Sequence, residues 1–429
     1  MNLVNGRVLE TADCEPILAE LRARVLQTIE KGGLDAETVI GACHRLVTEL
    51  DEAAYLQAMA ELGVSAARGG GYIAQARELF CADALRARLR AELGENYGRA
   101  SEYLPLSGRR RVREQILPLG VLLHIAAGNM DALPVFSVLE GLLTGNVNIL
   151  KLPAAEGGVS IRLLSELIKI EPSLAEYIYV FDYSSRDIEN LEKLISVSDA
   201  VAVWGGDEAV SALRRLVKPN TKLIEWGHKV SFAYVTPRGV TEAALSGLAE
   251  HIAETNQLLC SSCQGIFVDT DDMARVHDFC ERLLPVLEAR RRANGAIGIG
   301  ISSQVTLEVY TAELEAVQIR EKRVFRGDRC SLTATPDRAL ESAIGYCNAW
   351  VKPLPRAALL SALRPHKNHL QTVGLLCAQD ERDALTELFF KAGAVRVSAG
   401  ARMSGTHVGA ARDGEYALRR YTKVVCAED

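Results

Sequence analysis

The sequence lacks several features that would assign it to a membrane, secreted or nucleic-acid-binding class. No stretch approaches the roughly 18 consecutive apolar residues of a transmembrane helix, so a membrane span is excluded. The N-terminus lacks the charged-then-apolar order of a signal peptide. A net charge of −6 gives no general attraction for nucleic acid or anionic lipid. These absences predict a cytoplasmic protein with neither kind of partner.

The cysteines lack the spacing of a disulfide framework or of a structural metal site. Of ten cysteines, only Cys260 and Cys263 form a C-x-x-C pair. A zinc site requires a second pair or a nearby histidine pair, and none follows at suitable spacing. A thioredoxin-like redox pair is the alternative, but the preceding segment is typical of a helix. No metal is expected, and most other cysteines are interpreted as small buried hydrophobes.

The composition is that of a well-buried globular protein. The chain has 429 residues, of which 48% are hydrophobic and 24% charged. It is too long for one ordinary core and too apolar for a disordered chain. Two or three domains are therefore expected.

The apolar pattern changes along the chain. Residues 15–100 carry helical spacing. From about residue 111, short apolar strands alternate with helices, which indicates βαβ units and a parallel sheet, and the alternation begins again after 230. Strands are predicted at 112–116, 120–126, 147–151, 178–181, 200–204, 231–235, 265–269 and 394–398, and helices at 132–144, 156–168, 240–256 and 271–290.

These patterns divide the chain into four parts and predict an α/β fold. A helical N-terminal part over 1–105 packs on a dinucleotide-binding domain of Rossmann type over 106–230. An α/β domain over 231–395 contains Cys260, and a C-terminal segment over 396–429 is a candidate for oligomerisation.

The segment that says most about chemistry is residues 256–264, NQLLCSSCQ. It places the Cys260 thiol among small and amide residues, and Glu225 lies upstream on a strand-like run. A thiolate attacks carbonyl or thioester carbon. The pattern predicts covalent catalysis by Cys260, with a buried structural cysteine as the alternative.

Three further segments precede it in a fixed order. Residues 124–134 (HIAAGNMDALP) run from a strand into a loop that carries Asn129. Residues 144–153 (TGNVNILKLP) form a strand that ends in Lys151. Residues 204–208 (WGGDE) run from a strand into a glycine turn.

This order resembles the aldehyde dehydrogenase superfamily and, within it, the LuxC-like acyl-CoA reductases. The narrower resemblance rests on 124–134, 144–153 and 256–264, and is reinforced by 370–374 (LQTVG) and 413–418 (DGEYAL). It covers roughly residues 110–425. It implies an aldehyde dehydrogenase-like fold, in which a Rossmann-type cofactor domain accompanies an α/β catalytic domain.

The resemblance also implies roles for the catalytic residues. Cys260 would be the nucleophile, and Cys263 is the second thiol. Asn129 would donate its side-chain amide to the oxyanion together with the backbone N–H of Cys260. The alternative for Asn129 is a residue that holds a turn after Gly128.

The resemblance assigns four residues to a nicotinamide cofactor. Lys151 would bind ribose hydroxyls or phosphate, unless it is a surface lysine at a strand end. Gly205 and Gly206 would let the backbone approach the cofactor, although such turns are common. Ala154 stands where hydrolytic relatives often have a glutamate, which would repel a 2′-phosphate. NADPH is therefore expected, with NADH as the alternative.

Three positions depart from the family pattern. Hydrolytic aldehyde dehydrogenases use a glutamate at the position of Glu225 as general base to activate water, and reductive enzymes do not need one. His228 occupies the second glycine of the family's Gly-Gly-Lys and is interpreted as a loop histidine. Arg412 stands where the LuxC-like pattern usually has histidine.

The resemblance as a whole implies NADPH-dependent reduction of an acyl thioester, acyl-CoA or acyl-protein and fatty in type, to an aldehyde. An acyl-activating partner protein and a homo-oligomer are expected with it. One alternative is oxidation of an aldehyde to a free acid with Glu225 as base. The other is a catalytically idle homologue that serves as a subunit of a complex.

Overall fold

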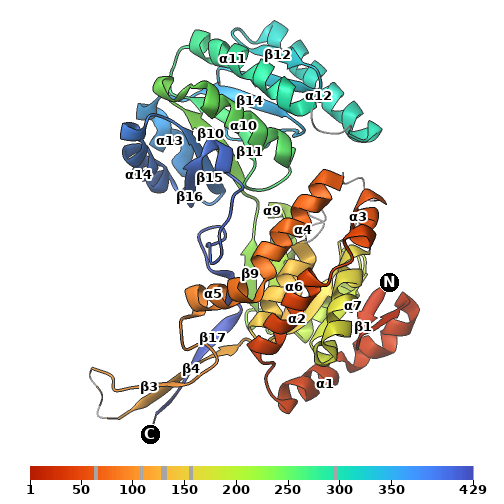
Figure 1. Ribbon diagram of the computed structural model, residues 1–429. Helices are drawn as coiled ribbons and strands as arrows, with labels where there is room; N and C mark the ends of the chain where they lie inside the picture. Colours follow the sequence, from red (N-terminus) through yellow and green to blue (C-terminus); the bar gives the residue numbers. More distant parts are fainter. Residues whose placement is uncertain are drawn as a thin grey trace. The chain divides into compact units, whose positions relative to one another are not determined.

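The chain folds as two units. The computed structural model describes residues 1–61, 66–106, 108, 110–126, 133–153, 158–292 and 297–428. The first unit contains Met1–Gly227 and His407–Asp429, and the second contains His228–Thr406 (Figure 1). No helix in these described ranges combines the length and apolar character that a bilayer crossing requires.

The first unit is built on a seven-stranded sheet in the order β2-β1-β7-β6-β5-β8-β9. The strands from β7 to β9 are parallel, whereas β1 and β2 are antiparallel additions at one edge. The strand bounds are β1 Asn2–Val4, β2 Arg7–Leu9, β5 Val121–Ile125, β6 Val147–Lys151, β7 Ile178–Phe181, β8 Ala200–Trp204 and β9 Lys222–Trp226.

The parallel strands have the order of a doubly wound nucleotide-binding fold. The chain runs from β5 outward to β7, then returns to β8 on the other side of β5. The direction of winding therefore reverses between β5 and β8, and ligands of such sheets bind outside the carboxyl ends of the strands at this point. This topology confirms the α/β fold that the alternation of strands and helices predicted.

Helices cover both faces of the sheet because successive side chains on a strand point to opposite sides. Leu150 and Val180 pack under α2, α5, α6 and α7 on one face, whereas Ile149 and Val201 pack under α1, α8 and α9 on the other. The helices are α1 Glu15–Lys31, α2 Ala36–Thr48, α3 Glu52–Glu61, α4 Ala66–Phe80, α5 Ala82–Leu93, α6 Leu133–Leu143, α7 Val159–Ile170, α8 Ile188–Ser196, α9 Asp207–Leu216 and α15 Ala417–Arg420.

The C-terminal strand returns to the first unit. Strand β17 (Thr422–Glu428) pairs antiparallel with the whole of β4 (Val112–Pro118), and β3 (Ser101–Tyr103) pairs with the other edge of β4. The sequence pattern did not anticipate β1, β2 or β3, because three residues are too few to establish an alternation.

The second unit contains another seven-stranded sheet, in the order β12-β13-β14-β11-β10-β15-β16, which is parallel except for β12. The strands are β10 Val230–Val235, β11 Cys263–Val268, β12 Arg323–Gly327, β13 Cys330–Ala334, β14 Asn348–Pro353, β15 Leu370–Leu376 and β16 Arg396–Ala399. The helices are α10 Glu242–Thr255, α11 Met273–Arg292, α12 Ile299–Gln318, α13 Leu359–Leu363 and α14 Arg382–Ala392.

Candidate functional site

Cys260 lies on the loop between α10 and β11. The helix ends at Thr255, and Asn256 and Gln257 both have positive φ, 48° and 59°, which turns the chain sharply away from the helix axis. The Gln257 side chain fastens this loop: its Nε2 donates to the Cys263 carbonyl at 2.9 Å, and its Oε1 accepts from the Asn348 N–H at 3.0 Å. The loop is thereby held against the amino end of the central strands of the sheet.

The Cys260 side chain is exposed, and an amide group is directed at its sulfur. Gln371, at the amino end of β15, donates from Nε2 to Cys260 Sγ at 3.2 Å. The Ser231 hydroxyl donates to the Cys260 carbonyl at 2.7 Å and accepts from the Thr372 N–H at 3.0 Å. A donor aimed at sulfur favours the thiolate, which is the nucleophilic form. Cys260 follows the carboxyl end of α10 and not the N-terminus of a helix. Its hydrogen-bond donors therefore come from strands β10 and β15.

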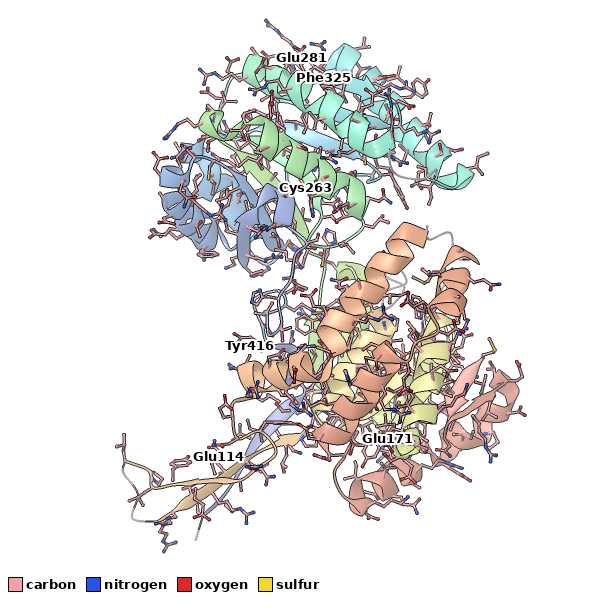
Figure 2. All side chains as sticks on the ribbon, viewed as in Figure 1. Glu114, Glu171, Cys263, Glu281, Phe325 and Tyr416 are labelled. Carbon is pink, nitrogen blue, oxygen red and sulfur yellow. The ribbon has the colours of Figure 1, made fainter. Side chains whose placement is uncertain are left out.

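Cys263 is in a different environment. It is fully buried on β11, inside the second unit (Figure 2), and its thiol donates to the Gly265 carbonyl at 3.2 Å. Burial raises the pKa of Cys263 to about 12, so it is a neutral thiol at neutral pH. Within the described residues, no cluster of three or more His, Cys, Asp or Glu could hold a metal ion.

The carboxyl edge of the first sheet carries the three described residues that sequence reasoning assigned to a cofactor. Lys151 ends β6, and its Nζ donates to Ser185 Oγ at 2.7 Å. Burial lowers the pKa of Lys151, and Asp182 opposes that shift. A buried amine beside a hydroxyl suits a ribose hydroxyl or a phosphate oxygen.

Gly205 and Gly206 join β8 to the amino end of α9. A Cβ on Gly206 would meet nothing within 4 Å, so the backbone there is open to a ligand. The free N–H groups of a helix N-terminus favour phosphate, although Asp207 and Glu208 in the first turn of α9 reduce that attraction. Asn129 and Ala154 lie outside the described residues.

Glu225 is held in an ion pair on the face of the sheet that α9 covers. Leu223 packs with the α9 side of the sheet and Ile224 with the opposite side, so the alternation along β9 places Glu225 toward α9. Both carboxylate oxygens of Glu225 accept from Arg214 of α9, one of them from Nη2 at 2.6 Å. The Glu225 side chain is 25% exposed. Its carboxylate is therefore occupied by a guanidinium in this conformation.

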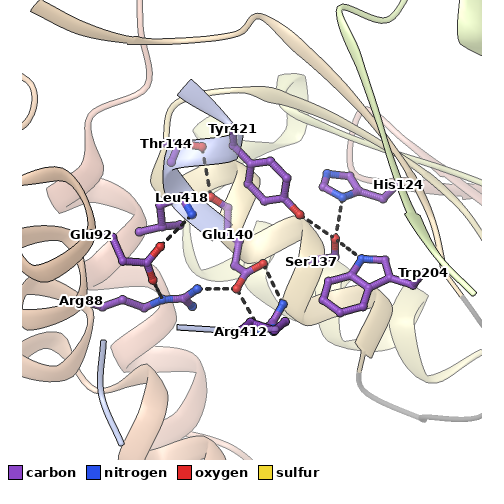
Figure 3. Close-up of polar contacts among 10 residues, drawn as sticks. All are labelled: Arg88, Glu92, His124, Ser137, Glu140, Thr144, Trp204, Arg412, Leu418 and Tyr421. Atoms are coloured by element: carbon purple, nitrogen blue, oxygen red, sulfur yellow. Dashed lines mark hydrogen bonds and ion pairs between the residues drawn. The ribbon is translucent and has the colours of Figure 1, made fainter. Parts of the chain in front are cut away.

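A buried ion network joins the C-terminal segment to α5 and α6 (Figure 3). Glu140 of α6 is fully buried and pairs with both Arg88, at 2.5 Å, and Arg412, at 3.2 Å. Arg88 also binds Glu92 at 2.7 Å, and Glu92 accepts from the Leu418 N–H at 2.8 Å. Sequence patterns gave no signal for Glu140, because a single acidic residue in an apolar helix has no partner in its own segment.

A second buried network surrounds Ser137 (Figure 3). His124 Nε2 lies 2.9 Å from Asn148 Oδ1, and Nδ1 lies 2.7 Å from Ser137 Oγ. Since Asn148 Oδ1 only accepts, His124 carries its proton on Nε2, and Ser137 donates to Nδ1. The Ser137 oxygen then accepts from the Trp204 indole N–H at 3.1 Å and from the Tyr421 hydroxyl at 3.5 Å.

Two buried histidines give a prediction for the pH dependence of stability: His124, and His251 of α10, whose Nε2 accepts from the Cys263 N–H at 3.3 Å. Burial lowers the pKa of both His124 and His251 to about 4, below the ordinary value of about 6.5. The unfolded chain therefore binds protons between about pH 6.5 and 4 that the folded chain does not. The contribution of these histidines to the free energy of unfolding is fully present above about pH 6.5. It is lost as the pH falls toward 4, by up to ~3 kcal/mol for each histidine.

The measurement is urea unfolding at several pH values between 4.5 and 7.5. His251→Gln should flatten the slope of unfolding free energy against pH, and His44→Gln, at an exposed position of α2, should leave it unchanged. Equal slopes in the wild type and His251→Gln would contradict the prediction.

Comparisons with known proteins agree with this fold and with these motifs. The chain matches the family described as acyl-CoA reductase (LuxC) over residues 34–424. It is 31% identical over 183 residues to the long-chain acyl-protein thioester reductase of Vibrio harveyi. The aligned residues cover 42% of this chain and 38% of that protein. The chain is 28% identical over 175 residues to the long-chain acyl-protein thioester reductase of Aliivibrio fischeri. The aligned residues cover 40% of this chain and 36% of that protein. These matches span under two fifths of each relative.

Solved structures resemble the whole chain in fold. An NAD-dependent aldehyde dehydrogenase from Sinorhizobium meliloti has a TM-score of 0.77 at 16% identity, covering 100% of this chain and 94% of that one. A putative methylmalonate-semialdehyde dehydrogenase from the same organism, complexed with NAD, also has a TM-score of 0.77, at 11% identity, covering 100% and 97%. The fold is therefore that of the aldehyde dehydrogenases, and the chain belongs to the acyl-CoA reductase (LuxC) family.

Proposed function

We propose that this chain reduces an acyl thioester to an aldehyde with NADPH, through a covalent acyl-enzyme on Cys260. The observation that carries the proposal is the environment of Cys260. Its thiol is exposed and receives the Gln371 amide, whereas Cys263, the other thiol of the pair, is buried and protonated. Family membership supports the same chemistry.

The proposed reaction at Cys260 is a thiol exchange followed by a reduction. The Cys260 thiolate attacks the thioester carbon, the new C–S bond forms, and the carrier thiolate leaves and takes a proton. Gln371 stabilises the thiolate before attack and again when it is released. Asn129 stays the proposed donor to the oxyanion, on the basis of the sequence alone. Collapse of the reduced Cys260 adduct releases the aldehyde and regenerates the thiolate.

The carboxyl edge of the first sheet would hold the cofactor. Lys151 would bind a ribose hydroxyl or a phosphate, and the open backbone at Gly206 would admit the pyrophosphate. A reduced nicotinamide bound there supplies the hydride that converts the acyl group to the aldehyde oxidation level. The choice of NADPH rests on Ala154, which places no carboxylate where a 2′-phosphate would be repelled.

The substrate we propose is a long acyl chain carried by CoA or by a protein. The relatives from Vibrio harveyi and Aliivibrio fischeri are named long-chain acyl-protein thioester reductases, which supports both the chain length and a protein carrier. An acyl-activating partner protein, a homo-oligomer and a cytoplasmic location belong to the same proposal.

Intact-mass measurement after incubation with a panel of acyl-CoAs, in the absence of cofactor, tests the proposal. The wild type should gain the mass of one acyl group and lose it when NADPH is added, with one aldehyde released per adduct. Cys260→Ala should gain no mass. Absence of an adduct on the wild type with every acyl-CoA and with an acylated carrier protein would refute the proposal.

Oxidation of an aldehyde to a free acid is the second candidate, because Glu225 occupies the position of the hydrolytic base. The ion pair with Arg214 favours reduction, since both carboxylate oxygens of Glu225 already accept hydrogen bonds from the guanidinium, whereas a general base must accept one from water.

Two substitutions at this ion pair are expected to separate the candidates. Glu225→Gln should leave acyl-CoA reduction within about threefold of the wild type, because the carboxylate takes no part in it. Arg214→Ala should raise the yield of free acid relative to aldehyde by up to about fivefold. This is the factor that corresponds to the free energy of an exposed ion pair. Both products are quantified by gas chromatography. A wild type that oxidises aldehydes to free acids, and a hundredfold loss of that oxidation in Glu225→Gln, would favour the oxidative candidate.

A further inference from the structure

We propose that Arg412 is a positioning residue that fixes the turn at Gly205 and Gly206 for cofactor binding. The inference rests on the proposed function, in which this turn receives the nicotinamide cofactor. It assigns a role to a residue that departs from the family pattern and lies on the C-terminal segment, far from the turn in sequence.

The Arg412 guanidinium lies over three aromatic rings, of which Figure 3 draws Trp204. Its Cζ lies 4.4 Å from the centroid of Phe136, 4.7 Å from Trp204 and 5.7 Å from Trp226. The two tryptophans are themselves stacked, with centroids 5.2 Å apart and an interplanar angle of 22°. We call these three rings with Arg412 the aromatic cage.

Glu140 sets the direction of the guanidinium within the aromatic cage. Its two oxygens lie 3.2 and 3.3 Å from the terminal nitrogens of Arg412, and its own side chain is fully buried. A planar guanidinium can make this two-point ion pair along its edge and stack through its face, which an ammonium cannot. The cage is therefore specific for arginine rather than for positive charge.

Trp204 connects the aromatic cage to the cofactor turn. It is the last residue of β8 and immediately precedes Gly205. Its ring is held by Arg412 on its face and by Ser137, which accepts from its indole N–H. Gly205 donates its backbone N–H to the Trp226 carbonyl at 3.2 Å. Because glycines have no side chain to fix them, the conformation of the turn depends on these anchors at Trp204 and Trp226.

The C-terminal segment presents Arg412 through a tight turn of its own. Arg412 and Glu415 exchange backbone hydrogen bonds of 2.8 Å in both directions, and Asp413 and Gly414 have φ of 50° and 84°. Arg412 thus reaches the cage from a fixed backbone. Loss of its side chain should loosen Trp204 and the turn that follows it.

Arg88 offers a matched control within the same network. It pairs with Glu140 and lies over Phe136 at 5.4 Å, as Arg412 does. Among the described contacts it touches neither tryptophan. Loss of either arginine leaves Glu140 with one partner, so both losses should destabilise the fold, but only loss of Arg412 should affect the turn.

The experiment is NADPH titration of the purified full chain, by calorimetry and by tryptophan fluorescence, for the wild type, Arg412→Gln, Arg412→Lys and Arg88→Gln. Both Arg412 variants should raise the Kd for NADPH about tenfold and raise KM for NADPH with little change in kcat. Arg88→Gln should lower the melting temperature comparably but leave Kd within about twofold. Without cofactor, only the Arg412 variants should shift tryptophan emission, since two of the chain's three tryptophans lie in the cage.

The outcomes separate this inference from the proposed function. If the wild type binds NADPH and the Arg412 variants bind it equally well, the inference is wrong and the function stands. If Arg88→Gln weakens binding as much as Arg412→Gln, Arg412 has only a structural role. A wild type that binds neither NADPH nor NADH would overturn the proposed function and this inference together.

Discussion

Replacing Cys260 with alanine is expected to lower the rate of acyl-thioester reduction by on the order of 10³-fold or more, because no acyl-enzyme can form without the thiolate. Cys260 is exposed, so truncation of its side chain removes little buried surface. The melting temperature should therefore stay close to that of the wild type. The measurement is aldehyde production under saturating NADPH and acyl-CoA.

Cys263→Ala is the matched control for this prediction. Cys263 is buried, and burial raises its pKa to about 12, so it supplies no thiolate at neutral pH. Its loss should reduce turnover by no more than a few-fold, although the small cavity should lower stability by about 1 kcal/mol. If Cys263→Ala were the inactive variant and Cys260→Ala the active one, the assignment of the nucleophile would be wrong.

Removal of the Glu140 carboxylate is expected to destabilise the first unit by about 3–5 kcal/mol. Glu140 is fully buried and is the common partner of Arg88 and Arg412. Its replacement by alanine leaves two largely buried guanidinium groups without that partner, and breaking a buried pair in this way costs about that much. Urea unfolding followed by far-ultraviolet circular dichroism measures the change in the free energy of unfolding.

Glu415→Ala provides the comparison. Glu415 pairs with Arg420 at 3.1 Å, but its side chain is 55% exposed. An ion pair screened by water contributes up to about 1 kcal/mol, so this variant should be nearly as stable as the wild type. A loss below about 1 kcal/mol in Glu140→Ala would mean that the buried network contributes little, and the argument for Arg412 as an anchored residue would weaken.

Much of the fold could be predicted from local sequence. The run of strands from 120 to 204 and the restart after 230 correspond to β5–β8 and β10–β11, because an apolar strand or an amphipathic helix is recognisable within its own residues. The assignment to the LuxC family also followed from short motifs, and the family match over residues 34–424 confirms it.

Less of the candidate site could be predicted from the sequence, because its contacts join segments that are far apart along the chain. The 370–374 segment was noticed as part of a pattern, but nothing in it indicated that Gln371 would reach Cys260, 111 positions away. Glu225 was interpreted as a candidate base, and its pairing with Arg214 depends on which face of β9 turns toward α9. The roles of Cys260, Lys151, Gly205 and Gly206 stay predictions, now with defined surroundings.

The sequence by itself determined the elements, the family and the thiol, because each is encoded in residues that are neighbours along the chain. Only the tertiary structure decided what surrounds them. Sheet order brings β15 beside β10 and so places Gln371 at Cys260, and the returning C-terminal segment carries Arg412 to Glu140 across 272 positions. Such contacts depend on strand pairing and burial, in which residues from distant segments compete for the same partners. A local sequence pattern therefore does not indicate which of these residues will come into contact.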